Sequence, residues 1–249
     1  MIILFIANPG FTQEKDKYFN RMDPVVRGYD GSVRTAEEFF KRGTMRMADR
    51  LFEEAIDDFS KAIEIEPQYA AAYNNRGIAK RHLKDYRGAL EDFNMASDLD
   101  PKYEEVYNNR GNVKLDMGDF AGAIDDYTKA IDLDHKLADA YNNRGLAKKN
   151  LGLTESAIED FSIAIQLEHR FIDAYNNRGM AKNNIQDYTG AIEDFTQAID
   201  IAPKFDMAYA NRGIVKIMIG LKDEGCLDLN KASELGNAPA NDLIRKYCQ

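Results

Sequence analysis

A period of 34 residues that runs without insertion is the feature that most limits how this chain can fold. Aligning the 249-residue sequence on itself gives a single register from Ala36 to Pro239. Such a period is typical of arrays in which each repeat is one supersecondary unit that buries its apolar face against its neighbours. The sequence therefore predicts six tandem repeats, at 36–69, 70–103, 104–137, 138–171, 172–205 and 206–239.

Each repeat has the pattern of two helices joined by a turn. In the second repeat the first segment carries Tyr73 and Gly77, and the second segment carries Ala89 and Phe93 before it stops at Pro101. The small residues fall where two helices must approach closely, and the aromatic ring falls between them. We therefore expect an all-α protein in which every repeat is one helix-turn-helix hairpin.

This pattern resembles the tetratricopeptide repeat family, whose period is 34 and whose signature is W-x2-L-G-x2-Y, A-x3-F, P. The fifth repeat matches it at Gly179, Ala191, Phe195, Ala198 and Pro203. The resemblance implies a right-handed α-solenoid, a superhelix whose first helices line a concave groove where ligands bind. The sixth repeat matches least well.

The chain departs from the family in one regular way, because arginine replaces the family's leucine and lysine or arginine replaces its tyrosine. An aspartate follows each of these arginines sixteen places later, so we predict an Arg–Asp pair joining the two helices of each hairpin. Independent solvated charges are the alternative. The pairs are Arg42 and Asp58, Arg76 and Asp92, Arg110 and Asp126, Arg144 and Asp160, Arg178 and Asp194, and Arg212 and Asp228.

A row of asparagines recurs on the first helices, in YNNRG or YANRG runs. A primary amide both donates and accepts hydrogen bonds, so it can pair with the backbone of an extended peptide. The row resembles the asparagine ladder of the O-linked N-acetylglucosamine transferase family, and hydrogen bonding between neighbouring helices is the alternative use. The candidate groove residues are Asn75, Asn109, Asn143, Asn177 and Asn211, with Asn74, Asn108, Asn142 and Asn176 before them.

Charged residues stand near this amide row. Glu105, Asp139 and Asp173 add negative charge close to the expected groove, and Arg81 and Lys149 add positive charge further along the helices. We expect the resulting long-range steering of ligands to be mild.

The two ends of the array have different predicted roles. Residues 1–13 are mostly apolar and read either as a truncated signal peptide or as an apolar arm, and 14–35 reads as a linker. A signal peptide would make the protein exported or periplasmic, and an arm would leave it cytoplasmic. Thr35 with Glu38 predicts a capping box, and residues 240–249 predict a C-terminal capping helix.

The sequence contains only two cysteines, Cys226 and Cys248. A C-terminal helix antiparallel to the last repeat helix would bring them together, so a disulfide is one alternative and two reduced, partly buried thiols are the other. They lack the spacing and the nearby histidine of a zinc site, so we expect neither a metal nor a cofactor.

The composition restricts the class of partner. A formal net charge of -9 disfavours a surface that tracks phosphates, so we expect a protein or peptide partner and no nucleic acid. No apolar run reaches the roughly 20 residues needed to span a bilayer.

No nucleophile, base or acid recurs in a catalytic arrangement, so we expect no enzyme activity. The favoured function is a scaffold that binds a peptide or protein segment in the concave groove. The alternatives are a self-assembling repeat protein, which would form a homo-oligomer, and an accessory subunit of another enzyme.

Overall fold

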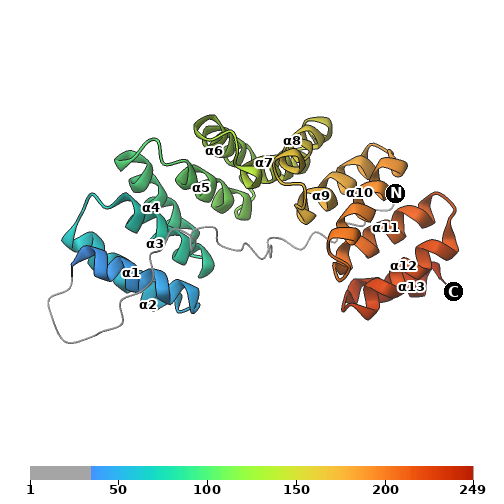
Figure 1. The fold of residues 1–249 in the computed structure, drawn as a ribbon, viewed down its shortest axis with the longest axis horizontal. Helices are drawn as coiled ribbons and strands as arrows, with labels where there is room; N and C mark the ends of the chain where they lie inside the picture. The colour runs from blue at the N-terminus through green and yellow to red at the C-terminus, as the bar shows by residue number, and fades with distance from the viewer. Residues whose placement is uncertain (1–34, 249) are drawn as a thin grey trace. The chain divides into compact units, whose positions relative to one another are not determined.

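The computed structural model describes residues 35–248, and within that range it contains helices and turns and no strand. The fold class is the all-α solenoid of helix-turn-helix repeats (Figure 1). The predictions for residues 1–13 and 14–34 lie outside the described residues. No helix between 35 and 248 combines the length and apolar character that crossing a membrane requires.

The helices alternate between a first and a second helix of each repeat, and one further helix follows the sixth repeat. The first helices are α1 (Ala36–Ala48), α3 (Ala70–His82), α5 (Glu104–Asp116), α7 (Ala138–Asn150), α9 (Ile172–Asn184) and α11 (Asp206–Met218). The second helices are α2 (Phe52–Ile65), α4 (Tyr86–Leu99), α6 (Phe120–Leu133), α8 (Thr154–Leu167), α10 (Tyr188–Ile201) and α12 (Lys222–Glu234), and the last helix is α13 (Ala238–Tyr247).

The described chain divides into two compact units, one holding α1–α5 and the other α6–α13. Within each unit, successive helices pack against each other, and neighbouring first helices also contact, as α7 does with α9 and α9 with α11. Each repeat is therefore held both by its own hairpin partner and by the adjacent repeat.

The two helices of a hairpin approach closely because a glycine faces an aromatic ring. In the fifth repeat a Cβ on Gly179 would lie 2.7 Å from Cε1 of Phe195, a ring that is 1% exposed. The equivalent distance between Gly145 and Phe161 is 2.8 Å. A side chain at these glycines would displace the buried ring, which explains the small-residue positions of the motif.

The sixth repeat solves the same problem with different residues. Leu229 takes the place of the aromatic ring and is fully buried. A Cβ on Gly225 would lie 2.6 Å from the carbonyl oxygen of Gly213, so these helices approach backbone to backbone. Glycine at position 225, where the family has alanine, permits this close approach.

The N-terminal capping box is confirmed: Thr35 accepts a hydrogen bond from the Glu38 backbone, and the Glu38 side chain accepts one from the Thr35 backbone. At the other end, Ala240 and Leu243 of α13 are buried against the last repeat. Asn237 caps α13 by accepting a hydrogen bond from the Ala240 N–H.

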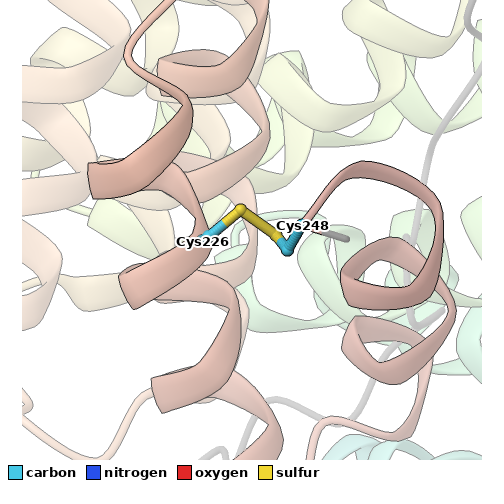
Figure 2. Close-up of a disulfide and its surroundings, with 2 residues drawn as sticks. All are labelled: Cys226 and Cys248. Carbon is cyan, nitrogen blue, oxygen red and sulfur yellow. A yellow bond between two sulfur atoms is a disulfide. The ribbon is translucent and has the colours of Figure 1, made fainter.

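A disulfide joins Cys226 of α12 to Cys248 at the end of α13, with Cα atoms 5.7 Å apart (Figure 2). Of the two alternatives for these cysteines, the structure contains the bonded one. A loop closed over a separation of 22 residues stabilises a fold by about 3 kcal/mol in the chain-entropy treatment. The bond therefore fixes α13 onto the last repeat.

The turn inside each hairpin needs one residue in the left-handed region. Gly152 has φ 80° there, whereas Gln186 holds the same place in the next repeat at φ 64°. A residue with a Cβ is disfavoured in this conformation, and glycine is not.

These two turns predict opposite effects of the same exchange. Gly152→Ala should destabilise the protein by about 1 kcal/mol, because alanine is strained at this positive φ. Gln186→Gly should relieve that strain and stabilise the protein by about 0.5 kcal/mol, a smaller change because the added freedom of glycine in the unfolded chain offsets part of the gain. Thermal unfolding of both variants measures this. Changes of the same sign would contradict the account of the turn.

Candidate functional site

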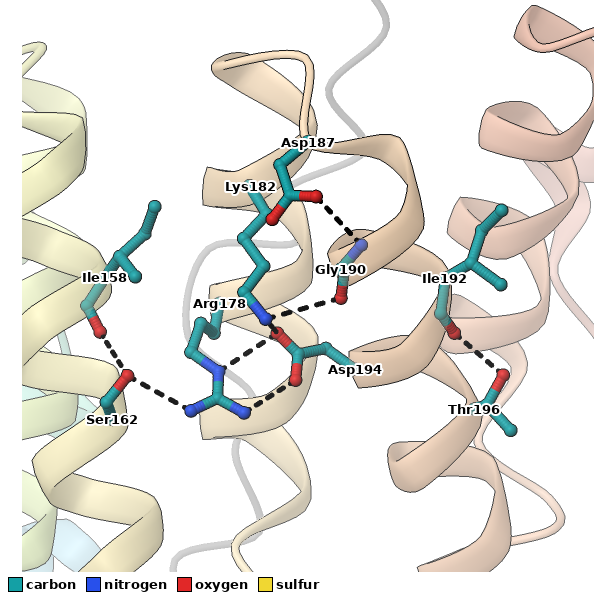
Figure 3. A network of polar contacts seen from close by, with 9 residues as sticks. All are labelled: Ile158, Ser162, Arg178, Lys182, Asp187, Gly190, Ile192, Asp194 and Thr196. Atoms are coloured by element: carbon teal, nitrogen blue, oxygen red, sulfur yellow. Dashed lines mark hydrogen bonds and ion pairs between the residues drawn. The ribbon is translucent and has the colours of Figure 1, made fainter.

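The YNNRG runs of the first helices define the candidate site, and their arginines lie in a buried ionic cluster. In the fifth repeat Nε and Nη2 of Arg178 donate to Asp194 at 3.0 and 2.7 Å (Figure 3). Nζ of Lys182 lies 2.8 Å from the same carboxylate. Because Asp194 is only 2% exposed, two cations neutralise one buried anion.

The same arrangement recurs in the first, second, fourth and sixth repeats. Arg42 and Arg46 both bond Asp58, and the equivalent clusters are Arg76 and Lys80 on Asp92, Arg144 and Lys148 on Asp160, and Arg212 and Lys216 on Asp228. In the third repeat, Asp126 is buried in α6 at 4% exposure, and Arg110 lies on α5.

The arginine also reaches the preceding repeat. Nη1 of Arg178 donates to the Ser162 hydroxyl at 3.1 Å, and that hydroxyl donates in turn to the Ile158 carbonyl (Figure 3). The equivalent contacts are Arg76 to Ser60, Arg110 to Asn94, Arg144 to Thr128 and Arg212 to Thr196. One guanidinium thus joins two helices of its own hairpin to the second helix before it.

The tyrosine of the run supports the same guanidinium from one turn away. Cζ of Arg178 lies 5.6 Å from the Tyr175 ring centroid, and the distance from Arg144 to Tyr141 is 5.4 Å. Guanidinium groups pack favourably over aromatic faces. The ring therefore fixes the side-chain conformation that the carboxylate requires.

Sequence reasoning paired each arginine with its aspartate but missed two members of the cluster. The lysine four places after the arginine, such as Lys148, was noted only as a departure from the family pattern. No role was predicted for the polar residue sixteen places before the arginine, such as Thr128. Both recur at the 34-residue period, so the signal was present in the sequence.

The asparagines bond each other across neighbouring first helices. Nδ2 of Asn177 on α9 donates to Oδ1 of Asn142 on α7 at 3.0 Å. The same distance separates Asn211 from Asn176, and Asn109 from Asn74. The second asparagine of one run therefore donates to the first asparagine of the run before it.

The two asparagines of a run differ in exposure. Asn74, Asn142 and Asn176 are buried, at 0%, 3% and 6% exposure. Asn75, Asn143, Asn177 and Asn211 are half-buried, whereas Asn109 is buried, and Asn108 is half-buried with its Oδ1 lacking a partner among the described residues. Part of the row thus remains accessible.

Two charged side chains, Lys149 on α7 and Asp173 on α9, do not belong to the repeating ionic clusters. The pKa of the Asp173 carboxyl is raised, first by burial and second by the charge of Asp139. Burial also lowers the pKa of the Lys149 amine to about 8. Both charges are desolvated by the fold without being neutralised by it.

In residues 35–248 no group of three or more histidine, cysteine or acidic side chains is arranged to hold a metal ion. The arrangement offers amides and isolated charges along a row of helices. It is suited to hydrogen bonding and charge recognition.

Three models of one kind of repeat match the sequence. The model described as TPR repeat matches residues 52–83 and 111–152, and models described as Tetratricopeptide repeat match 70–103, 172–205 and 138–168. Together these matches cover more than half of the chain.

Solved structures of known proteins are similar to this chain over much of its length. The crystal structure of MamA is 30% identical with a TM-score of 0.60, over 66% of this chain and 96% of that one. YrrB, described as "a TPR protein with an unusual peptide-binding site", is 22% identical with a TM-score of 0.61, over 76% and 97%. That second likeness concerns the fold alone.

A curated relative matches a shorter part. The DnaJ protein P58IPK homolog of Arabidopsis thaliana is 32% identical over 65 residues, or 26% of this chain. The match spans only 14% of that protein's length.

The ionic cluster predicts that Arg144→Leu is costly. Asp160 is 2% exposed and would lose its bidentate partner while keeping Lys148. We therefore expect a loss of about 3 kcal/mol, the lower end of the cost of removing one partner from a buried ion pair. Arg87→Leu is the matched control, because the Arg87 side chain is 93% exposed, and it should cost less than about 0.5 kcal/mol. Urea unfolding measures the free energy of unfolding of both variants. Equal losses would show that the buried pair contributes no more to stability than an exposed arginine does.

The Asp173 carboxylate predicts a substitution that stabilises the protein. A raised carboxyl pKa means that folding favours the protonated form, so this group lowers stability as pH rises through its pKa. Asp173→Asn should therefore raise the stability at pH 7 by about 0.5 kcal/mol, and the gain should shrink at acidic pH. Asp125→Asn, on an exposed position of α6, should change little. A lower melting temperature for Asp173→Asn at pH 7 would show that the carboxylate has a stabilising partner.

Proposed function

Because this chain belongs to the tetratricopeptide repeat family, we propose that it is a non-catalytic interaction scaffold that binds a peptide or protein segment along its first helices. The binding surface would be the concave groove that the family resemblance predicts. We call the surface carrying Asn143, Asn177, Asn211 and their neighbours on α7, α9 and α11 the first-helix face.

The accessible amides of this face carry the proposal. Asn177 and Asn211 each use one N–H in the amide row. Among the described residues, the Oδ1 atoms of these two asparagines accept no hydrogen bond. Each amide therefore keeps one donor and one acceptor, which is the pairing that an extended backbone offers.

The remaining chemistry of the face favours a protein partner. The chain has a formal net charge of -9, and Asp139 and Asp173 add negative charge to this surface. A polyanion would be repelled here. The arginines are held by buried aspartates and are not offered to phosphates, as Arg178 and Asp194 illustrate.

The known proteins give support of the same kind. YrrB is described as a protein of this repeat type with an unusual peptide-binding site. The Cys226–Cys248 disulfide in addition favours an oxidising compartment, where such bonds persist.

A peptide selection tests this function. A random decapeptide library would be selected against the immobilised protein, and recovered peptides would be titrated by fluorescence anisotropy. The double variant Asn177→Ala with Asn211→Ala should bind them at least about tenfold more weakly, since each amide contributes up to two hydrogen bonds.

The matched control is Gln197→Ala with Asn230→Ala, which removes two amides from exposed positions of α10 and α12. It should leave the affinity unchanged. Because the amide row also joins α7, α9 and α11, the melting temperature of each variant is measured, and titrations are run well below it. Recovery of no peptide, or equal binding by both variants, would contradict the proposal.

A further inference from the structure

Lys149 is a cation on α7 that has no counter-charge among the described residues. Lys149 lies half-buried in the last turn of α7. Among the described residues its side-chain amine makes no hydrogen bond or ion pair, in contrast to that of its neighbour Lys148, which binds Asp160. Burial lowers the pKa of the Lys149 amine, and no charge partner offsets this effect.

The same position is neutralised elsewhere in the chain. At the α3–α5 contact, Nε of Arg81 lies 2.7 Å from Oδ2 of Asp116. Two repeats later, Lys149 takes the position of Arg81 and Asn184 takes that of Asp116. An amide carries no charge. The ion pair that joins α3 to α5 therefore has no equivalent between α7 and α9.

We propose that Lys149 anchors a carboxylate of the bound segment, which takes the place beside it that Asp116 takes beside Arg81. This inference rests on the proposed function and adds the chemical class of the segment: it carries an acidic group at the C-terminal ends of α7 and α9. A lysine shielded from water and lacking a counter-ion gains more from such a group than a solvated one.

A second group without a partner lies in the last turn of α9, next to Asn184. Oδ1 of Asn183 is buried and has no hydrogen-bond partner in the described part of the chain. A buried acceptor of this kind is costly unless a donor reaches it. A backbone N–H next to the acidic group of the segment would supply that donor.

The opposite end of the face fixes the direction of the segment. Asp173 stands ten residues before Asn183 on α9, which is about 15 Å along a helix. Together with Asp139 it would repel a carboxylate there. The acidic group is thus attracted to one end of α7 and α9 and excluded from the other.

Two peptide libraries test this inference and separate the two sources of a carboxylate. One has free C-termini and the other amidated C-termini, and both are random decapeptides. Enrichment of aspartate or glutamate in both libraries identifies an acidic side chain. Binding that appears only with free C-termini identifies the terminal carboxylate.

Three substitutions then locate the anchor. Lys149→Met should weaken binding of the selected peptides by at least about tenfold, as expected for loss of a charge-assisted hydrogen bond. Lys149→Arg should keep most of the affinity. Asn184→Asp should restore the internal pair seen at Arg81 and Asp116, and so compete with the peptide.

Gln197→Glu, which adds the same charge at an exposed position of α10, is the control for Asn184→Asp and should bind normally. Peptides that bind wild type and Lys149→Met equally would overturn this inference while leaving the proposed function intact. Recovery of no peptide from either library would overturn both. Because Lys149 has no partner to lose, Lys149→Met should fold normally, which its melting temperature verifies.

Discussion

A buried carboxylate shared by two cations is the interaction on which this solenoid depends. Asp194 lies between α9 and α10 and accepts from Arg178 while Lys182 approaches its other side. The guanidinium that binds it also bonds Ser162 of the preceding repeat. An uncompensated charge at this depth would be costly, so the carboxylate requires both helices of its hairpin to be in register. The contact with Ser162 extends the requirement to the neighbouring repeat.

The repeated motif is almost fully explained by packing and polar satisfaction. In the fifth repeat, Tyr175 supports the guanidinium, Asn176 and Asn177 join neighbouring first helices, Arg178 holds the carboxylate, and Gly179 admits the Phe195 ring. What recurs at every period is therefore chiefly structural. Recognition of a particular partner is expected from residues on the same helices that do not recur.

Lys149 is of this second kind, because its counterparts in the other repeats are methionine, arginine, leucine, asparagine and isoleucine. Asp173 differs, because Glu37, Glu105 and Asp139 also place an acidic residue there, whereas the second and sixth repeats have alanine and methionine. Each is shielded from water, and neither is neutralised within the described chain. Sites that cost stability without serving the fold are where function is expected.

The 34-residue period was sufficient to predict the fold class, because small residues and rings at fixed places leave a helical hairpin as the arrangement that buries them. The pairing of Arg178 with Asp194 was predictable for the same reason, since both recur. The sequence could not decide how Asn142 and Asn177 divide their hydrogen bonds, because an amide satisfies a helix or a peptide equally well. The sequence did identify Lys149 as a positive charge on a first helix, but it could not show that no counter-charge lies beside the amine in the folded chain. The state of Cys226 and Cys248 depended on where α13 packs, which no local pattern specifies.

The central claim is that one buried carboxylate couples a hairpin to its neighbours. Native-state hydrogen exchange of Asp160→Asn measures this directly, because the substitution keeps the shape of the side chain and removes the charge that Arg144 and Lys148 share. Because Arg144 also bonds Thr128 of α6, the account predicts that amide protection falls in α7 and α8 and also in α6 of the preceding repeat. Protection that falls only around residue 160, with α6 and α7 unchanged, would contradict it.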